Sequence, residues 1–540
     1  MEDFDYVIVG GGSAGCVLAG KLSEDRTKRV LLIEAGGSDR RFWIRTPLGY
    51  GKTFFNPAVN WKYTTQPDPG LDGEEAYWPR GKVIGGSSSI NAMVYARGLP
   101  TDFDDWRDAG NPGWGWDDVG PVFRAVEHRV LPDGRVEGTG PLSVSYREPE
   151  YHPLKRFFYA AAREIGLPST DDMNGVRPEG VAAYAITTKN GLRCSAADAF
   201  LHPAMGKSNL VVRTQALATR IVVENRRASG IEYRWNGGSN RANARREVIV
   251  AAGAVNAPQL LQLSGIGPGA VLKAAGIGVL HDNPNVGGNL QDHLAVSYFY
   301  RATEPTLNQY LGSWSGRLRA GLRYLATRGG PLSLSVNQMG GLVRTRPDAP
   351  RPDCQLYFSP ASYTISTPGK RQLFKPDPFP GFLLSFNPCR PTSTGRIDIV
   401  SPDPTIPPAI RPNSLSTNKD LDDVVAGARL IRALRNTAAM RALIEAPHGF
   451  DVADADDEAV VADFRKRAGT VYHPTCTCRM APEALGGVVD HRLRVHGVEG
   501  LRVADASVFP NVTSANTNAP TIMLAFKAAA MIADDNRSRS

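Results

Sequence analysis

The stretch Asp5-Tyr6-Val7-Ile8-Val9-Gly10-Gly11-Gly12-Ser13-Ala14-Gly15 joins a short β-branched apolar run to a glycine-rich turn, and an Ala- and Leu-rich helical pattern then continues to Leu22. Gly10, Gly12 and Gly15 fit the G-x-G-x-x-G spacing, which permits a tight turn, backbone approach to a pyrophosphate and close helix packing. A second apolar run, Val30 to Ile33, ends in Glu34, where a carboxylate binds the ribose hydroxyls of an adenosine. These features predict a dinucleotide-binding βαβ unit. The alternative is a buried glycine-rich turn that binds no ligand.

Composition and charge place the chain among ordinary globular proteins. It has 540 residues, of which 42% are hydrophobic and 21% are charged, and its formal charge is +8. Acidic and basic residues are interspersed, so we expect solvated faces and no nucleic-acid partner. The six cysteines show no C-x-x-C spacing, which suits a reducing compartment. The first strand begins close to Met1 and no apolar run reaches ~20 residues, so we expect no signal peptide, no transmembrane segment and a cytoplasmic location.

A second stretch of small residues, Arg80 to Asn91, is followed by an apolar run to Tyr95. Small side chains let a backbone lie against a planar ligand, with free amides directed at it. Together with the opening motif, this stretch resembles the glucose-methanol-choline (GMC) family of FAD-dependent oxidoreductases, and it fits one of the two family signatures. Gly253 to Gly267 matches the second signature, except that Ala257 stands where the family usually has Ser or Thr. Pro258 is expected to start a helix there.

The resemblance extends along almost the whole chain. The further matching stretches are Asn60-Trp61, Gly191 to Ser195, Gly288 to His293, His473 to Met480 and Arg502 to Thr521. The glycine-serine stretch is most similar to the choline and alcohol dehydrogenase branch of the family. No second G-x-G-x-x-G follows a strand, and no cysteine pair has redox spacing. A nicotinamide site and a pyridine-nucleotide disulfide reductase are therefore disfavoured.

The expected fold is α/β (α+β), with two discontinuous domains. The resemblance implies a Rossmann-like FAD-binding domain, to which strand-like runs at 210–223, 230–234 and 247–252 belong. From about residue 299 the segments alternate in polarity, as in Gln355 to Phe358, Phe382 to Phe386 and Arg396 to Val400, and predict an antiparallel-sheet substrate-binding domain with flanking helices. A helix over 420–445 is expected to cover that sheet. The predicted ranges are 1–150, 191–298 and 466–540 for the FAD-binding domain, and 151–190 and 299–465 for the substrate-binding domain.

The candidate catalytic residues follow from the chemistry of alcohol oxidation. An alcohol gives up a hydride only if its hydroxyl proton is also removed or held, and a histidine does this near neutral pH. Among nine histidines, His473 is preferred because Pro474 shapes the turn, small polar residues follow it and it occupies the family's histidine position. The resemblance implies Asn516 as its partner, since the family has His or Asn there. Capping of the last helix is the alternative for Asn516, and we interpret His293 as structural.

The resemblance also implies the contacts of a bound FAD. In addition to Gly10, Gly12 and Gly15, the predicted contacts are Ser13, Ala14, Glu34, Ala35, Trp61, Val83, Ser87, Asn91, Ala92, Met93, Val94, Ala218, Tyr472, Asp505, Ala506 and Thr517. For Trp61 and Val83, core packing alone is the alternative. Some relatives attach FAD through a histidine at the position of Ile90, so we expect non-covalent FAD here. No metal site is expected.

The predicted reaction is oxidation of a primary alcohol to an aldehyde by hydride transfer to the flavin N5. The electron acceptor is either dioxygen or a quinone-type carrier, and the resemblance to the dehydrogenase branch favours a dehydrogenase. Aromatic residues predict an apolar, partly aromatic pocket, unless they form only the core of the sheet: Tyr357, Phe358, Tyr363 and Phe386. The alternatives are a hydroxynitrile-lyase-like flavoprotein and a non-catalytic flavin-binding protein. Retention of both His473 and Asn516 disfavours the non-catalytic protein.

Overall fold

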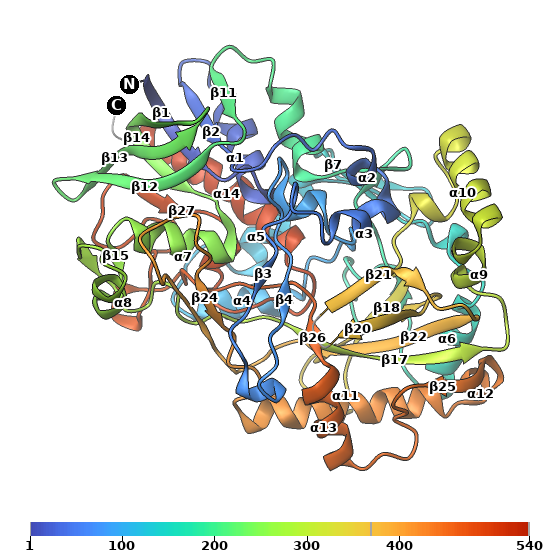
Figure 1. The fold of residues 1–540 in the computed structure, drawn as a ribbon. Helices are drawn as coiled ribbons and strands as arrows, with labels where there is room; N and C mark the ends of the chain where they lie inside the picture. Colours follow the sequence, from blue (N-terminus) through green and yellow to red (C-terminus); the bar gives the residue numbers. More distant parts are fainter. Residues whose placement is uncertain (1, 368–369, 538–540) are drawn as a thin grey trace.

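A computed structural model describes residues 2–367 and 370–537, and it contains two large sheets (Figure 1). The first sheet has the order β11-β2-β1-β14-β13-β12, with β27 paired to the last residues of β14. Its strands are β1 (Glu2–Val9), β2 (Val30–Ile33), β11 (Leu210–Arg213), β12 (Leu217–Glu224), β13 (Arg227–Trp235), β14 (Gly238–Val250) and β27 (Leu501–Val503). Strands β11, β2, β1, β14 and β27 run parallel, whereas β12 and β13 add an antiparallel meander.

The parallel part of the first sheet is buried, which explains its continuous apolar runs. Every residue of β2 is buried, and α1 (Ser13–Leu22) packs beside α14 (Asn518–Arg537) in the same core. The register aligns Val9 with Ile33 and with Val250. The carboxyl ends of these strands therefore meet at one edge, where open α/β sheets bind their ligands.

The second sheet is antiparallel, in the order β25-β17-β22-β19-β18-β8, with β26 paired to the start of β17. Its strands are β8 (Gly180–Ala183), β17 (Leu294–Ala302), β18 (Met339–Val343), β19 (Cys354–Ser359), β22 (Gly381–Pro388), β25 (Ile444–His448) and β26 (Gly469–Thr470). Helix α11 (Asn418–Arg435) covers one face of this sheet, next to β22, and the other face turns toward the first sheet. The α/β fold is confirmed. The domain ranges stay predictions, and β17 begins within the range assigned to the FAD-binding domain.

The remaining elements are shorter and mostly lie around the two sheets. The other helices are α2 (Phe42–Arg45), α3 (Tyr50–Thr53), α4 (Pro100–Asp108), α5 (Trp116–Val126), α6 (Lys155–Glu164), α7 (Gly253–Leu263), α8 (Gly269–Ala274), α9 (Leu307–Gly312), α10 (Trp314–Thr327), α11 (Asn418–Arg435), α12 (Ala438–Leu443) and α13 (Asp457–Arg467). The small strands are β3 (Tyr63–Thr64), β4 (Tyr77–Trp78), β5 (Glu127–Val130), β6 (Val136–Glu137), β7 (Leu142–Ser145), β9 (Thr188–Lys189), β10 (Leu192–Arg193), β15 (Ile266–Gly267), β16 (His281–Asp282), β20 (Tyr363–Thr367), β21 (Lys370–Pro376), β23 (Arg396–Asp398) and β24 (Ala409–Arg411).

Three local predictions are wrong. The helix expected over 420–445 is not continuous, because α11 ends at Arg435 and is followed by α12 and β25. Residues 396–400 do not join the second sheet, because β23 pairs with β24 in a separate hairpin. Helix α7 begins at Gly253 and contains Pro258 in its interior, so Pro258 does not start the helix. Within the described ranges 2–367 and 370–537, no helix is both long enough and apolar enough to cross a membrane.

Candidate active site

A long cavity follows the carboxyl edge of the first sheet and continues to the facing side of the second sheet. His473, Asn516 and most of the predicted cofactor contacts line it. The lining contacts are Gly10, Gly12, Ser13, Ala14, Glu34, Ala35, Trp61, Ser87, Asn91, Ala92, Met93, Val94, Ala218, Tyr472, Asp505, Ala506 and Thr517. One cavity thus collects residues from both ends of the chain, although their individual roles stay predictions.

Two of the predicted contacts do not line the cavity. Val83 is fully buried in a small cluster with Ile44, Val59 and Ile90, which agrees with the core-packing alternative, and its contact with FAD stays a prediction. Gly15 is the third residue of α1, and a Cβ atom there would come within 1.8 Å of the carbonyl oxygen of Gly10. Gly15 therefore serves close packing of helix on strand, which is the structural role of this glycine in the motif.

The adenosine end of the cavity is built from backbone amides and one carboxylate. Glu34 Oε2 accepts from the Gly11 amide at 2.8 Å, and Oε1 accepts from the Gly36 amide at 2.7 Å. Burial raises the pKa of Glu34 to about 7, while the two amides oppose that rise. A carboxylate has about four acceptor sites, so Glu34 can still accept the hydroxyls of a ribose.

The turn beside Glu34 fits a pyrophosphate. No side chain caps the first amides of α1, which open toward the cavity at Ser13 and Ala14. Gly12 and Gly86 lie back to back, and a Cβ at Gly86 would come within 2.6 Å of the Gly12 Cα. Uncapped amides at a helix N-terminus are donors suited to phosphate oxygens. The residues present therefore fit the dinucleotide that the sequence predicts.

His473 lies between Asn516 and His293. Its Nε2 is 3.0 Å from the amide nitrogen of Asn516, and its Nδ1 is 3.0 Å from Nδ1 of His293. His293 Nε2 lies 2.8 Å from the carbonyl oxygen of Cys389. Asn516 Oδ1 accepts from the side-chain amide of Gln355 at 3.3 Å. These contacts form one continuous chain of hydrogen bonds, and they involve the side chain of Asn516 in bonds other than helix capping.

The carbonyl at the end of this chain determines where the protons lie. A carbonyl only accepts, so His293 must donate Nε2–H to Cys389. Burial lowers the pKa of His293 to about 4, and the neutral ring offers an unprotonated Nδ1. His473 therefore donates Nδ1–H to His293, and its Nε2 carries a lone pair toward Asn516. His293 thus orients the His473 tautomer, a role that the sequence interpretation of His293 as structural missed.

The loop that carries His473 is fixed by a half-buried carboxylate and a half-buried arginine. Asp292 Oδ1 accepts from the amides of His473 and His293 at 2.8 and 2.9 Å. Arg80 donates to the carbonyl of Tyr472 at 2.7 Å, and burial lowers the pKa of Arg80 to about 10. Burial, His293 and Arg80 all lower the pKa of His473 well below its usual value. His473 is therefore neutral at physiological pH and can accept a proton.

The far end of the cavity is lined by the facing side of the second sheet. Side chains alternate along a strand, so Tyr357 and Ser359 face the cavity while Phe358 faces the helices. Tyr363 also lines the cavity, but Phe386 lies in the core with Phe358. The expected four-residue aromatic pocket is thus half wrong, because two of its members lie on the opposite face of the sheet.

The described lining at this end is neutral. The hydroxyl of Ser385 donates to the Val296 carbonyl at 2.7 Å, and that of Ser359 donates to the Val336 carbonyl at 3.0 Å. Both serines therefore keep only acceptor capacity toward the cavity. The carboxylates that line the cavity are Glu34 and Asp505, which follow β2 and β27 of the first sheet.

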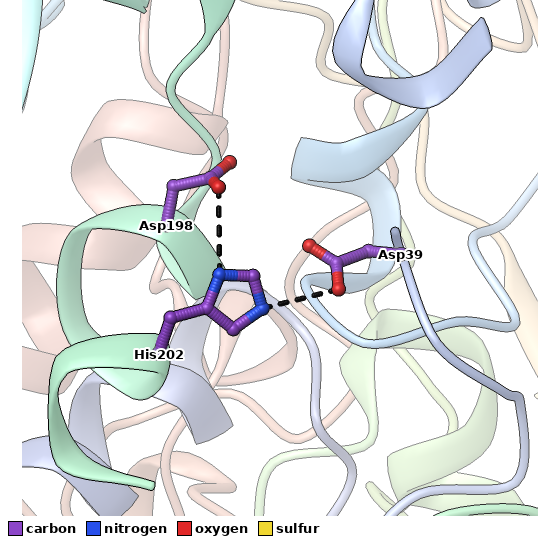
Figure 2. Close-up of side chains that lie close together, drawn as sticks. All are labelled: Asp39, Asp198 and His202. Carbon is purple, nitrogen blue, oxygen red and sulfur yellow. Dashed lines mark hydrogen bonds and ion pairs between the residues drawn. The ribbon is translucent and has the colours of Figure 1, made fainter. Parts of the chain in front are cut away.

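A second polar cluster lies outside the cavity lining (Figure 2). His202 directs Nε2 to Asp39 at 3.1 Å and Nδ1 to Asp198 at 3.5 Å. The two carboxylates raise the pKa of His202 to about 9, so the ring is a cation at neutral pH. A metal ligand requires a neutral imidazole nitrogen, whereas both nitrogens here are donors. We interpret the cluster as an ion-paired clamp between the segment after β2 and the π-helical turn Ala197–Leu201.

Comparison with known proteins agrees with this arrangement. Family models described as GMC oxidoreductase match residues 4–295 and 391–525. The chain is 41% identical to mitochondrial choline dehydrogenase of Homo sapiens, over 98% of this chain and 90% of the human protein. It is 40% identical to alcohol dehydrogenase [acceptor] of Pseudomonas putida, over 98% of this chain and 95% of that protein.

Solved structures give the same result. The structure of pyridoxine 4-oxidase from Mesorbium loti is 32% identical, with a TM-score of 0.87 and coverage of 98% of each chain. A formate oxidase structure is 26% identical, with a TM-score of 0.90 and coverage of 99% of each chain. With a nucleotide cavity along the first sheet and matches over almost its full length, the chain belongs to the GMC family of FAD-dependent oxidoreductases, which act on the CH–OH group of their donors.

Proposed function

We propose that the enzyme oxidises a primary alcohol to an aldehyde, with His473 as the base and Asn516 as its partner. The observation that carries this proposal is the unprotonated Nε2 of His473, held beside an amide donor at 3.0 Å. A substrate hydroxyl that takes the place of the amide at Nε2, about 3 Å from both groups, can donate its proton to Nε2 while it accepts from the Asn516 amide. The amide then stabilises the negative charge that develops on this oxygen.

The protein's own groups also manage the proton after transfer. Protonated His473 still donates Nδ1–H to His293, and His293 in turn donates to the Cys389 carbonyl. This chain spreads the new positive charge away from the substrate. FAD, when bound, supplies the hydride acceptor. Thr517 and Asn518, at the positive end of α14, line the cavity and favour negative charge beside it.

The proposed substrate is an apolar or aromatic primary alcohol. Tyr357, Tyr363 and Leu383 line the far end of the cavity, and no carboxylate lies there in the part of the chain that the structure describes. Tight binding of a quaternary ammonium requires either a carboxylate or an aromatic cage. The described lining of the far end offers aromatic rings but no carboxylate, so we place an uncharged alcohol first and choline second.

We further propose non-covalent FAD, a quinone-type carrier as electron acceptor and a cytoplasmic location. Ile90 lines the cavity at the position of the linking histidine and has no atom that can form that bond. Dioxygen is the second candidate acceptor. All six cysteines are unpaired and buried, which is compatible with a reducing compartment.

Anaerobic mixing of the yellow protein with aliphatic, aromatic and amino alcohols tests these proposals. We expect one class of alcohol to bleach the flavin absorbance. Rapid return of colour with peroxide on admission of air identifies an oxidase, and slow return identifies a dehydrogenase. A hydroxynitrile-lyase-like protein would bleach with no alcohol and would instead release cyanide from a cyanohydrin. Purified protein without yellow colour would favour a non-catalytic chain.

A further inference from the structure

Helix α10 carries a stripe of large apolar side chains that faces solvent. Trp314 is 78% exposed, Leu318 46%, Leu322 58% and Leu325 59%. At ~100° per residue, these four side chains fall within a sector about 80° wide. We call them the apolar stripe. A contiguous exposed patch of this kind marks a surface that meets another molecule or a membrane.

The rest of α10 explains how the helix is held. Gly316, Ala320 and Tyr324 are buried, and the Tyr324 hydroxyl donates to the Gly191 carbonyl at 3.1 Å. These three positions lie on the side of the helix away from the apolar stripe. Helix α10 therefore attaches through small residues and one tyrosine, and it presents its leucines outward. Figure 1 shows α9 and α10 projecting at one side of the molecule.

The charged residues of the segment that carries the apolar stripe are all positive. No Asp or Glu occurs from residue 305 to residue 347, whereas Arg317, Arg319, Arg323 and Arg328 lie within or directly after α10. By helical spacing, Arg317 flanks one side of the stripe and Arg319 flanks the other. In residues 2–367 and 370–537, none of these arginines forms an ion pair. Arg317 instead donates to the carbonyls of Leu311 and Gly312.

Helix α2 extends this surface. Phe42 is 51% exposed and Trp43 is 44% exposed, and their ring centroids are 4.9 Å apart. The Ile44 carbonyl of α2 accepts from Arg193, and Gly191 of the same turn accepts from α10. Both helices therefore contact the hairpin formed by β9 and β10. We define the docking face as the apolar stripe together with Phe42 and Trp43.

The docking face adjoins the substrate end of the cavity. Residues 47–49 connect α2 to α3, and Tyr50 of α3 lines the cavity. The short 3-10 helix Pro331–Ser333 contacts α10, and Val336 and Asn337 shortly after it also line the cavity. A partner bound to the docking face would thus lie close to the substrate end of the cavity.

We propose that the docking face seats the enzyme on a bilayer that contains anionic lipids, with α10 lying in the interfacial plane. Large apolar residues flanked by arginines, without carboxylates, are the pattern of an interfacial helix. The bilayer takes up the apolar side chains, and the lipid phosphates pair with the arginines. A second copy of the chain on the same face would bring two sets of arginines together without an acidic partner.

Vesicle co-sedimentation of the FAD-loaded protein tests this proposal. The probes are vesicles of phosphatidylcholine alone and of phosphatidylcholine mixed with phosphatidylglycerol. The double variant L318S/L322S removes half of the apolar stripe, and R319Q reduces the charge beside it. L485S is the matched control, because Leu485 is 61% exposed and lies outside the docking face. Unchanged FAD content and melting temperature verify that each variant is folded.

We expect the wild type and L485S to bind the mixed vesicles, and high salt to weaken this binding. R319Q should bind about fivefold more weakly, and L318S/L322S about tenfold or more. Equal binding to both kinds of vesicle, or equal binding by wild type and L318S/L322S, would overturn the proposal. A lipid-free dimer that L318S/L322S converts to a monomer would also overturn it, since the face would then be an interface between copies.

Discussion

Replacement of His293 by alanine removes the group that orients His473. The Nδ1–H of His473 then loses its acceptor inside a buried site, and the ring is free to adopt the tautomer with hydrogen on Nε2. That tautomer cannot receive the alcohol proton. An unmade buried hydrogen bond costs about 1–3 kcal/mol, so we expect flavin reduction to slow by about five- to 150-fold.

His293→Asn should recover part of the rate, because an asparagine Oδ1 can occupy the place of the accepting Nδ1. The pH dependence provides a second readout. The His293 ring contacts His473 directly and is one of the groups that shift its pKa, so alanine should move the acid limb of the rate. A residue that only fills space would not move this limb.

Anaerobic stopped-flow bleaching with an excess of the best alcohol measures both effects. The control is His128→Ala, because His128 is exposed and lies outside the cavity lining. Rates are compared per bound FAD, which corrects for any loss of cofactor. If His293→Ala bleaches within twofold of the wild type and keeps the same acid limb, His293 does not orient His473 and the tautomer assignment is wrong.

Four further predictions follow from the same structure. His473→Ala should slow flavin bleaching about a hundredfold or more, and Asn516→Ala about a hundredfold, in the same stopped-flow assay. Gln355→Leu should slow it less, because it removes the hydrogen bond that orients the Asn516 amide, and one to Tyr184, but leaves the amide itself in place. Acid precipitation should release all the yellow colour into the supernatant, whereas colour kept in the pellet would contradict non-covalent FAD. His202→Gln should lower the melting temperature most below pH 6.5, since the folded pKa of about 9 exceeds the unfolded value; thermal scans should show the gap closing as pH rises through 9.

Sequence patterns predicted the parts of this fold that depend on local chemistry. The run from Asp5 to Gly15 contains its own strand, turn and helix start, and the spacing to Glu34 follows from one βαβ unit. Strand β19 was also predicted. Which of Tyr357 and Phe358 lines the cavity and which lies in the core, however, depends on the face of the sheet that α11 covers. That choice is made by packing between distant segments, so the aromatic residues were predicted as a group although only half face the cavity.

The contact between His293 and His473 could not be predicted from local sequence patterns, for a related reason. The two residues are 180 positions apart, and their contact requires the Asp292 carboxylate to hold both backbone amides and the Cys389 carbonyl to face the ring. A family signal was present, because Gly288 to His293 matches the family, yet a match does not reveal which partner a histidine has.

The hydrogen-bond chain through His473 joins segments that are far apart in the sequence. His293 immediately precedes β17, Cys389 follows β22, and His473 follows β26, so all three sit at ends of strands in the second sheet. Asn516 comes from the segment that leads from β27 of the first sheet into α14. A contiguous domain would carry only one side of this arrangement. His473 is held by the second sheet and Asn516 by the first, so the 3.0 Å distance between them depends on the relative position of the two sheets. A substitution that moves the sheets apart should therefore reduce catalysis before it reduces binding of the adenosine half of FAD, whose contacts with Glu34 and the amides of α1 lie in the first sheet alone.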